Sequence, residues 1–126
     1  MNPEDQTDLL FVYGTLREKG SNGWRMKSAP LIGEGWVYGI LLDIGSFPGL
    51  ILGGTEKVIG EVRQIQVRDL PALDAYEDDA YRRIRLQVKL PDRTLEAWAY
   101  EWLEDRDAFP KIAGGDWLAV EGSGNS

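Results

Sequence analysis

The sequence predicts an α+β fold built on a small, mixed, barrel-like sheet with few helices. Five apolar or alternating runs between residues 9 and 102 have the pattern of strands, and the last two form a hairpin. One segment, residues 68–79, has the spacing of a helix with an apolar side. Several strands with one clear helix favour a barrel or a strongly curled sheet, and a chain of 126 residues suits one domain.

The first three predicted strands are recognised by their apolar residues. Residues 9–13, LLFVY, are apolar throughout, as in a strand that is buried on both faces. Residues 35–44, GWVYGILLDI, combine aromatic with β-branched side chains, which favour strands. Residues 58–67, VIGEVRQIQV, place apolar side chains among polar ones. Together these runs predict three strands ahead of the helix.

The last two predicted strands form a β-hairpin. In residues 83–90, RIRLQVKL, every second side chain is apolar. Residues 91–94, PDRT, make the turn. In residues 95–102, LEAWAYEW, small or aliphatic side chains occupy one face and aromatic side chains the other. The returning strand is therefore expected to be covered on both faces.

A single clear helix is predicted over residues 68–79, RDLPALDAYEDD. Asp69 is a suitable N-cap, and Pro71 falls in the first turn, where a missing N–H costs no hydrogen bond. The helix is therefore expected to begin near residue 69 and to connect the third strand to the hairpin.

Glu77 is the strongest single candidate for chemistry. At 100° per residue its side chain lies within about 60° of Leu70 and Leu73, whereas Asp74 and Asp78 are expected to point elsewhere. A carboxylate beside apolar residues is partly desolvated, which raises its pKa. A raised pKa allows a carboxylate to act as a general base near neutral pH.

Ordinary structural roles for this acidic segment remain open. Glu77 could bend out to water at the helix end, or pair with Arg82 or Arg83. The acidic cluster within residues 74–79 could suggest a hard cation, but it lacks the spacing of a calcium loop. Because two arginines follow, an ion-paired helix end explains the cluster more simply.

The turn YGTLR, residues 13–17, is the second candidate. A glycine directly after a strand lets the backbone approach a ligand closely, and successive N–H groups can hold an anion. An ordinary turn is the alternative, and the spacing is not that of a P-loop. The glycine-rich residues 31–39, LIGEGWVYG, lie in a strand-like run with no helix behind them, which disfavours dinucleotide binding.

The chain has neither cysteine nor histidine, and this narrows its chemistry. Disulfides, thiolate zinc sites, a cysteine nucleophile and a Ser-His-Asp triad are excluded. A transition metal would find only oxygen ligands. Proton transfer must therefore fall to Asp, Glu, Lys or Tyr side chains.

The charge and the apolar runs limit the expected partners. A formal net charge of −7 disfavours nucleic acid, because it repels the phosphates. No apolar stretch approaches the roughly 20 residues that span a bilayer, so no membrane partner is expected. The first eight residues are acidic and polar, unlike the start of a secretory signal. The resulting expectation is a cytoplasmic protein.

Six short motifs occur in order between residues 9 and 118. They are FVYGTLR with GSN behind it (11–22), FPGL (47–50), GEV (60–62), LDAYE followed by YRR (73–83), AWAY (97–100) and IAGGDW (112–117). Each is weak alone, but in this order they resemble the γ-glutamylcyclotransferase family, in its small AIG2-like branch. Asp78 departs from the pattern, because many relatives have glycine after the glutamate of the fourth motif.

The resemblance implies a domain and a reaction. The domain is a γ-glutamylcyclotransferase-like α+β barrel over residues 9–118, with residues 1–8 and 119–126 as flexible ends. The reaction releases 5-oxoproline from a γ-glutamyl amide or peptide, when the substrate α-amine attacks its own γ-carbonyl and expels the amine. Because the nucleophile belongs to the substrate, no metal, cofactor or protein nucleophile is expected.

The resemblance also assigns site residues. The catalytic glutamate falls on Glu77, as general acid and base. Substrate binding falls on the first motif and on the end of the late strand, at Tyr13, Gly14, Thr15, Leu16 and Tyr100. The amides of the turn are expected to hold the α-carboxylate or the developing oxyanion, whereas Arg17 and Asn22 are expected to brace the loop.

Two other functions remain open at this point. The chain could be a binding or accessory module that keeps the pocket and binds a small acidic amide without turnover. It could also be a carboxylate-based hydrolase that uses water and releases free glutamate. The sequence names neither the amine side of the substrate nor the oligomeric state.

Overall fold

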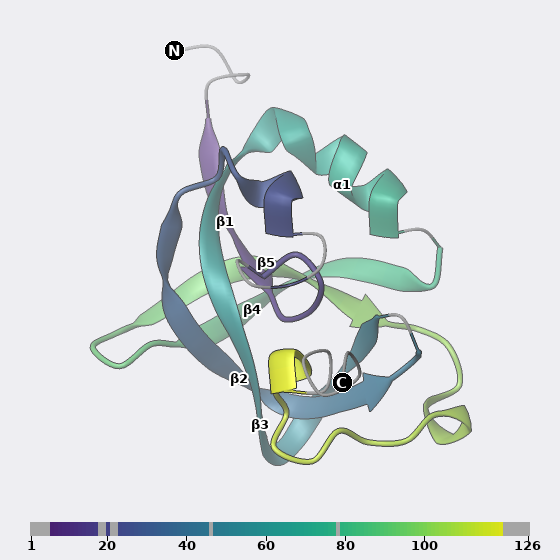
Figure 1. The fold of residues 1–126 in the computed structure, drawn as a ribbon. Coiled ribbons are helices and arrows are strands. Elements are labelled where there is room, and N and C mark those ends of the chain that lie inside the picture. Colours follow the sequence, from purple (N-terminus) through teal and green to yellow (C-terminus); the bar gives the residue numbers. More distant parts are fainter. Residues whose placement is uncertain (1–5, 18–19, 21–22, 46, 78, 120–126) are drawn as a thin grey trace.

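The structure, a computed structural model, describes residues 6–17, 20, 23–45, 47–77 and 79–119 (Figure 1). The main elements are β1 (Thr7–Val12), β2 (Leu31–Asp43), β3 (Pro48–Gln66), α1 (Leu70–Glu77), β4 (Tyr81–Lys89) and β5 (Thr94–Trp102). Short 3-10 turns are η2 (Gly23–Met26), η3 (Val67–Asp69) and η4 (Arg106–Ala108).

The five strands form a closed barrel in the order β1-β3-β2-β4-β5. All neighbours pair antiparallel except β5 and β1, which close the barrel in parallel where Leu10 lies beside Trp98. The predicted α+β fold with a barrel-like sheet is confirmed. Closure satisfies the strand edges, so a small domain needs no further sheet to cover them.

Strands β2 and β3 are longer than the sequence pattern predicts. β2 begins at Leu31 instead of residue 35, and β3 begins at Pro48 instead of residue 58. Gly53 and Gly54, at φ of 105° and 88°, resemble a turn in the sequence but lie inside β3. The long pairing of the two strands absorbs this irregularity through a register shift at Tyr38.

The predicted hairpin is confirmed over its full length. β4 and β5 pair continuously from Tyr81 and Trp102 to Lys89 and Thr94. Side chains on both faces of β5 are almost fully buried, at Ala97, Ala99, Tyr100 and Trp102. The expectation that the returning strand is covered on each side therefore holds.

Strand β1 separates two apolar clusters. Phe11 belongs to the cluster inside the barrel, whereas Leu10 and Val12 belong to a second cluster on the other face of the strand. Leu70 of α1 packs into this second cluster, and Leu73 lies against it. The helix thus covers one side of the barrel (Figure 1) and brings its C-terminal end beside the end of β1.

The helix begins close to the predicted position. Asp69 directly precedes α1, where the sequence places the N-cap, and is also the last residue of the 3-10 turn η3. The backbone N–H of Leu70 donates to the carbonyl of Val67, which closes η3 at the start of α1. Pro71 lies in the first turn, as predicted.

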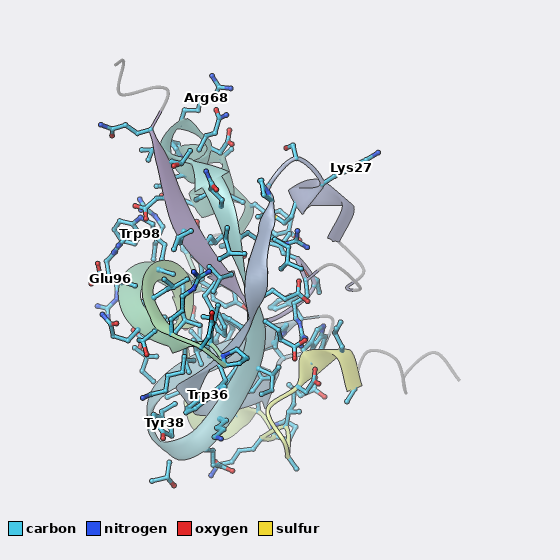
Figure 2. All side chains as sticks on the ribbon, turned by 90° about the vertical axis from the view of Figure 1, so that its left-hand side faces the viewer. Lys27, Trp36, Tyr38, Arg68, Glu96 and Trp98 are labelled. Atoms are coloured by element: carbon cyan, nitrogen blue, oxygen red, sulfur yellow. The ribbon has the colours of Figure 1, made fainter. Side chains whose placement is uncertain are left out.

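Two residues of the predicted flexible N-terminal end are structured. Thr7 and Asp8 belong to β1, and the Asp8 carboxylate accepts hydrogen bonds from Arg85 at 2.9 Å and from the Trp98 indole at 3.0 Å. Trp98 lies on the outer side of β5 (Figure 2). The acidic octet gave no sign of these partners, which lie 77 and 90 residues away. Residues 1–5 and 120–126 lie outside the described residues.

Within the described ranges, every helix is too short or too polar to cross a membrane.

Candidate active site

A cavity of about 380 Å³ opens where the end of β1 meets the end of α1. The turn after β1, the start of β3 and the facing strands β4 and β5 complete its walls. All six predicted site residues line it: Tyr13, Gly14, Thr15, Leu16, Glu77 and Tyr100. Four further lining residues bear on its chemistry or shape but had no predicted role, namely Phe47, Pro48, Tyr76 and Tyr81.

Glu77 lines this cavity and has no ionic partner among the residues that the structure describes. Arg82 pairs with Glu101 at 2.8 Å and Arg83 pairs with Asp74 at 2.8 Å, so neither arginine neutralises Glu77. Among the described residues, none donates a hydrogen bond to its carboxylate. Burial therefore acts unopposed and raises the pKa of Glu77 from 4.5 to about 7. The alternative of an ion-paired helix end does not apply to Glu77.

Glu77→Gln is expected to stabilise the protein near pH 8 by on the order of 1 kcal/mol and to leave stability unchanged near pH 4. Because the folded pKa is raised to about 7, the folded state keeps a proton that the unfolded state loses above 4.5. The free energy of unfolding of the wild type thus falls as the pH rises from 4.5 to about 7, whereas that of the glutamine variant does not. Because Glu77 is partly in contact with solvent, the gain in free energy stays below the value that the full pKa shift would give.

Urea unfolding of the wild type and Glu77→Gln at several pH values measures this difference. Glu56→Gln, at an exposed position of β3 outside the cavity, is the control and is expected to show no such pH-dependent gain. A stability difference that stays constant from about pH 4 to pH 8 would contradict the buried-carboxylate account.

Three tyrosines surround Glu77 and stay protonated. Burial raises the pKa of Tyr13, Tyr81 and Tyr100, and the nearby charge of Glu77 raises the pKa of each further. Their hydroxyl groups donate inside the protein: Tyr13 to the carbonyl of Tyr100 at 2.5 Å, and Tyr81 to the carbonyl of Pro48 at 2.6 Å. The phenols are thus held in place beside the carboxylate.

The turn after β1 presents backbone donors to the cavity. Arg17 N–H donates to the Gly14 carbonyl at 3.1 Å and closes the turn. No described residue accepts a hydrogen bond from the N–H groups of Gly14, Thr15 or Leu16, so these donors remain for a ligand. A side chain at Gly14 would place its Cβ 2.7 Å from Pro48, so the glycine is needed for close packing against β3.

Arg17 holds this turn from behind the cavity. Its side chain is only 3% exposed and binds Glu61 of β3 at 3.2 Å and Asp116 at 2.8 Å, with Glu34 of β2 at 3.7 Å. Asp116 also accepts from the N–H of Leu118 at 3.1 Å. The first and last motifs of the sequence therefore meet in one ionic network. Asn22, the other residue expected to brace the loop, lies outside the described residues.

Asp74 was expected to point elsewhere than Glu77 and the leucines of the helix, and this expectation is wrong. Its carboxylate accepts a hydrogen bond from the Tyr100 hydroxyl at 2.7 Å and binds Arg83. The spacing itself carried the signal, because residues three apart on a helix differ by about 60° in direction. Asp74 therefore lies on nearly the same side of α1 as Glu77.

The acidic segment forms no metal site in the part of the chain that the structure describes. No three acidic side chains there are arranged to hold a metal ion. Glu77 is also the one charged side chain among the described lining residues. Asp78, where many relatives have glycine, lies outside the described residues.

Comparison with known proteins gives one consistent family. A family described as "Gamma-glutamyl cyclotransferase, AIG2-like" matches residues 10–119. The chain is 35% identical over 110 residues to the gamma-glutamylcyclotransferase family protein YtfP of Escherichia coli K12, covering 86% of this chain and 95% of that protein. It is 33% identical over 118 residues to the gamma-L-glutamyl-butirosin B gamma-glutamyl cyclotransferase of Niallia circulans, covering 86% and 74%.

Solved structures show the same fold. The crystal structure of a mouse AIG2-like protein superposes with a TM-score of 0.75 at 26% identity, covering 85% of this chain and 86% of that one. The solution structure of E. coli ytfP superposes with a TM-score of 0.65 at 32% identity, covering 90% and 98%. The barrel that positions the cavity is thus shared with these proteins.

Proposed function

Because the chain belongs to the AIG2-like gamma-glutamyl cyclotransferase family, we propose that it releases 5-oxoproline from a γ-glutamyl amide or peptide. The names of the relatives support an enzyme of this kind. The observation that carries the proposal is the carboxylate of Glu77, which has no ionic partner among the described residues and whose pKa is raised to about 7 by burial in the cavity beside the turn after β1. A carboxylate with this pKa can exchange protons near neutral pH.

Glu77 acts first as a base and then as an acid. It removes a proton from the substrate α-ammonium, and the resulting amine attacks the γ-carbonyl carbon of the same molecule. A new C–N bond closes the five-membered ring, and the carbonyl oxygen takes the negative charge. As the bond to the leaving nitrogen breaks, the carbonyl re-forms and Glu77 returns its proton to that nitrogen. The ring nitrogen, which keeps two hydrogens and a positive charge after the attack, then loses its second proton to the regenerated Glu77 carboxylate, which passes it to the released amine or to water, so atoms and charge balance. Because the amine and the carbonyl belong to one molecule, holding that molecule in the reactive orientation lowers the activation barrier by several kcal/mol.

The turn after β1 supplies the complementary charge. The N–H groups of Gly14, Thr15 and Leu16, for which no described residue is an acceptor, can bind the substrate α-carboxylate or the developing oxyanion. The lining thus combines these donors with the acceptor Glu77. We propose that no metal or cofactor takes part, since the substrate supplies the nucleophile and Glu77 the proton transfer.

The purified protein incubated with a panel of γ-glutamyl amides is expected to release 5-oxoproline, followed by mass spectrometry. The panel contains a γ-glutamyl dipeptide, glutathione, a γ-glutamyl-lysine cross-link and gamma-L-glutamyl-butirosin B, because the last appears in the name of the Niallia circulans relative. Parallel reactions with a chelator are expected to proceed at the same rate.

Each other outcome points to a different function. A thermal shift with the amides and no product would indicate a binding or accessory module. Free glutamate in place of 5-oxoproline would indicate hydrolysis by water. A rate abolished by the chelator and restored by a metal ion would contradict cofactor independence.

A further inference from the structure

The hydrogens of the three cavity tyrosines all point to acceptors of the protein itself. The Tyr13 and Tyr81 hydroxyls face the carbonyls of Tyr100 and Pro48, and the Tyr100 hydroxyl faces the Asp74 carboxylate. Carbonyl and ionised carboxylate oxygens can only accept. Each tyrosine must therefore supply the hydrogen of its bond, and what remains on its oxygen is a lone pair.

Asp74 is held as an acceptor by Arg83. The guanidinium donates to both carboxylate oxygens, at 2.8 Å and 3.3 Å. Burial opposes ionisation of Asp74, but the hydrogen bonds from Arg83 and Tyr100 outweigh it and lower its pKa. Arg83 in turn stacks on the ring of Trp98 at 4.3 Å, on the outer side of β5 (Figure 2). Arg83 and Tyr100 thus both donate to Asp74, and Asp74 acts only as an acceptor.

The lining of the cavity therefore offers a ligand two kinds of group, hydrogen-bond donors and hydrogen-bond acceptors. The backbone N–H groups of the turn after β1 are donors, whereas Glu77 and the oxygens of Tyr81 and Tyr100 are acceptors. No cationic side chain is present among the described lining residues. A ligand that carries a carboxylate and an ammonium on one carbon can bind both kinds of group. Its carboxylate accepts from the backbone N–H groups, and its ammonium donates to the tyrosine oxygens.

We infer that Asp74 is a positioning residue, which keeps the Tyr100 hydrogen out of the cavity so that the Tyr100 oxygen accepts a hydrogen bond from the substrate α-ammonium. Without Asp74, the hydroxyl hydrogen is free to turn toward another acceptor, and Glu77 is the charged one lining the cavity. Tyr100 would then compete with the ammonium for Glu77 and would repel its N–H groups. This inference rests on the proposed function.

The test compares two ligands that differ only in the α-amine, γ-glutamyl-n-butylamide and its des-amino analogue N-butylglutaramate. Asp74→Ala is expected to weaken the affinity for the amine-bearing ligand roughly tenfold, because a hydrogen bond to a charged group is lost. The affinity for the des-amino analogue is expected to stay within about twofold of the wild type, because that ligand has no α-ammonium to donate to Tyr100. KM and Ki report these affinities, and calorimetry reports them where no turnover occurs.

Three further variants separate positioning from structural damage. Asp74→Asn is expected to retain wild-type affinities, because Arg83 keeps an amide oxygen beside the Tyr100 hydroxyl. Asp74→Ala added to Tyr100→Phe is expected to cause no further loss, since the hydroxyl is already gone. Asp92→Ala, at an exposed hairpin position, is the matched control and is expected to behave as the wild type.

Some results would overturn the inference. They are equal loss of affinity for both ligands in Asp74→Ala, wild-type affinity in that variant, or additive losses in the double variant. Failure of the proposed function is distinguishable, because it appears as absence of 5-oxoproline with the wild-type protein, while the calorimetric comparison of the two ligands still decides the role of Asp74.

Discussion

Glu77→Gln is expected to reduce kcat for 5-oxoproline release by at least about 100-fold, the usual contribution of a general acid–base group. Glutamine has nearly the same shape and can still accept a hydrogen bond, but it cannot take a proton from the α-ammonium. Since no described residue donates a hydrogen bond to Glu77, the substitution breaks no described contact. The fold is therefore expected to survive, with substrate affinity within about tenfold of the wild type.

Steady-state kinetics with the preferred amide of the panel measures this loss, and circular dichroism checks the fold. Glu56→Gln, exposed and outside the cavity, is the control and should keep wild-type kinetics. A folded Glu77→Gln protein with full turnover would remove Glu77 from the mechanism.

The pH dependence of the wild type gives a second check on the same group. Only the ionised carboxylate can accept the proton, so kcat/KM is expected to fall about tenfold per pH unit below the pKa of Glu77, about 7. If Glu77 had the ordinary pKa of a glutamate, kcat/KM would stay unchanged down to about pH 4.5. A kcat/KM that begins to fall only near that pH would show that burial does not raise the pKa of Glu77 in solution.

Arg17→Met is expected to lower the free energy of unfolding by about 3 kcal/mol, the low end for removing one partner of a buried ion pair. Arg17 is 3% exposed and its partner Glu61 is 8% exposed, so the remaining carboxylate cannot recover its solvation fully. Arg63 still lies 3.5 Å from Glu61, and Asp116 is 41% exposed, which together keep the loss from being larger. Methionine fills similar space, so the lost charge dominates.

Urea unfolding measures this loss, and Arg82→Met is the matched control. Arg82 pairs with Glu101, but its side chain is 63% exposed, so this loss is expected to stay below about 1 kcal/mol. Equal losses in Arg17→Met and Arg82→Met would show that the Arg17 network does not stabilise the fold.

The Arg17 network also explains how distant motifs build one site. Arg17 joins the turn of Gly14, Thr15 and Leu16 to β3 and to Asp116, near the C-terminal end of the described chain. Its side chain does not line the cavity, so its effect on a ligand passes through the position of the turn. The FVYGTLR and IAGGDW motifs are therefore parts of one structural unit, although 99 residues separate Arg17 from Asp116.

The sequence pattern was sufficient for the elements and for most of the candidate site. Alternation over residues 83–102 predicted the hairpin, and the spacing of Leu70 and Glu77 predicted which side of the helix faces the barrel. These properties are local, because the direction of a side chain within a strand or helix follows from the backbone repeat alone. The ends of β2 and β3 were missed, since Gly53 and Gly54 resemble a turn locally. Only the pairing of Leu52 and Lys57 with adjacent residues of β2 shows that β3 continues past them.

By itself, the sequence determined a β-rich α+β domain and the two segments, around Gly14 and Glu77, that line the candidate site. Only the tertiary structure decided that these segments share a cavity, that Arg82 and Arg83 pair with carboxylates other than Glu77, and that Asp74 faces Tyr100. The physical reason is that solvation and hydrogen-bond polarity depend on groups brought together by closure of the barrel. No periodicity within a single segment encodes those distances.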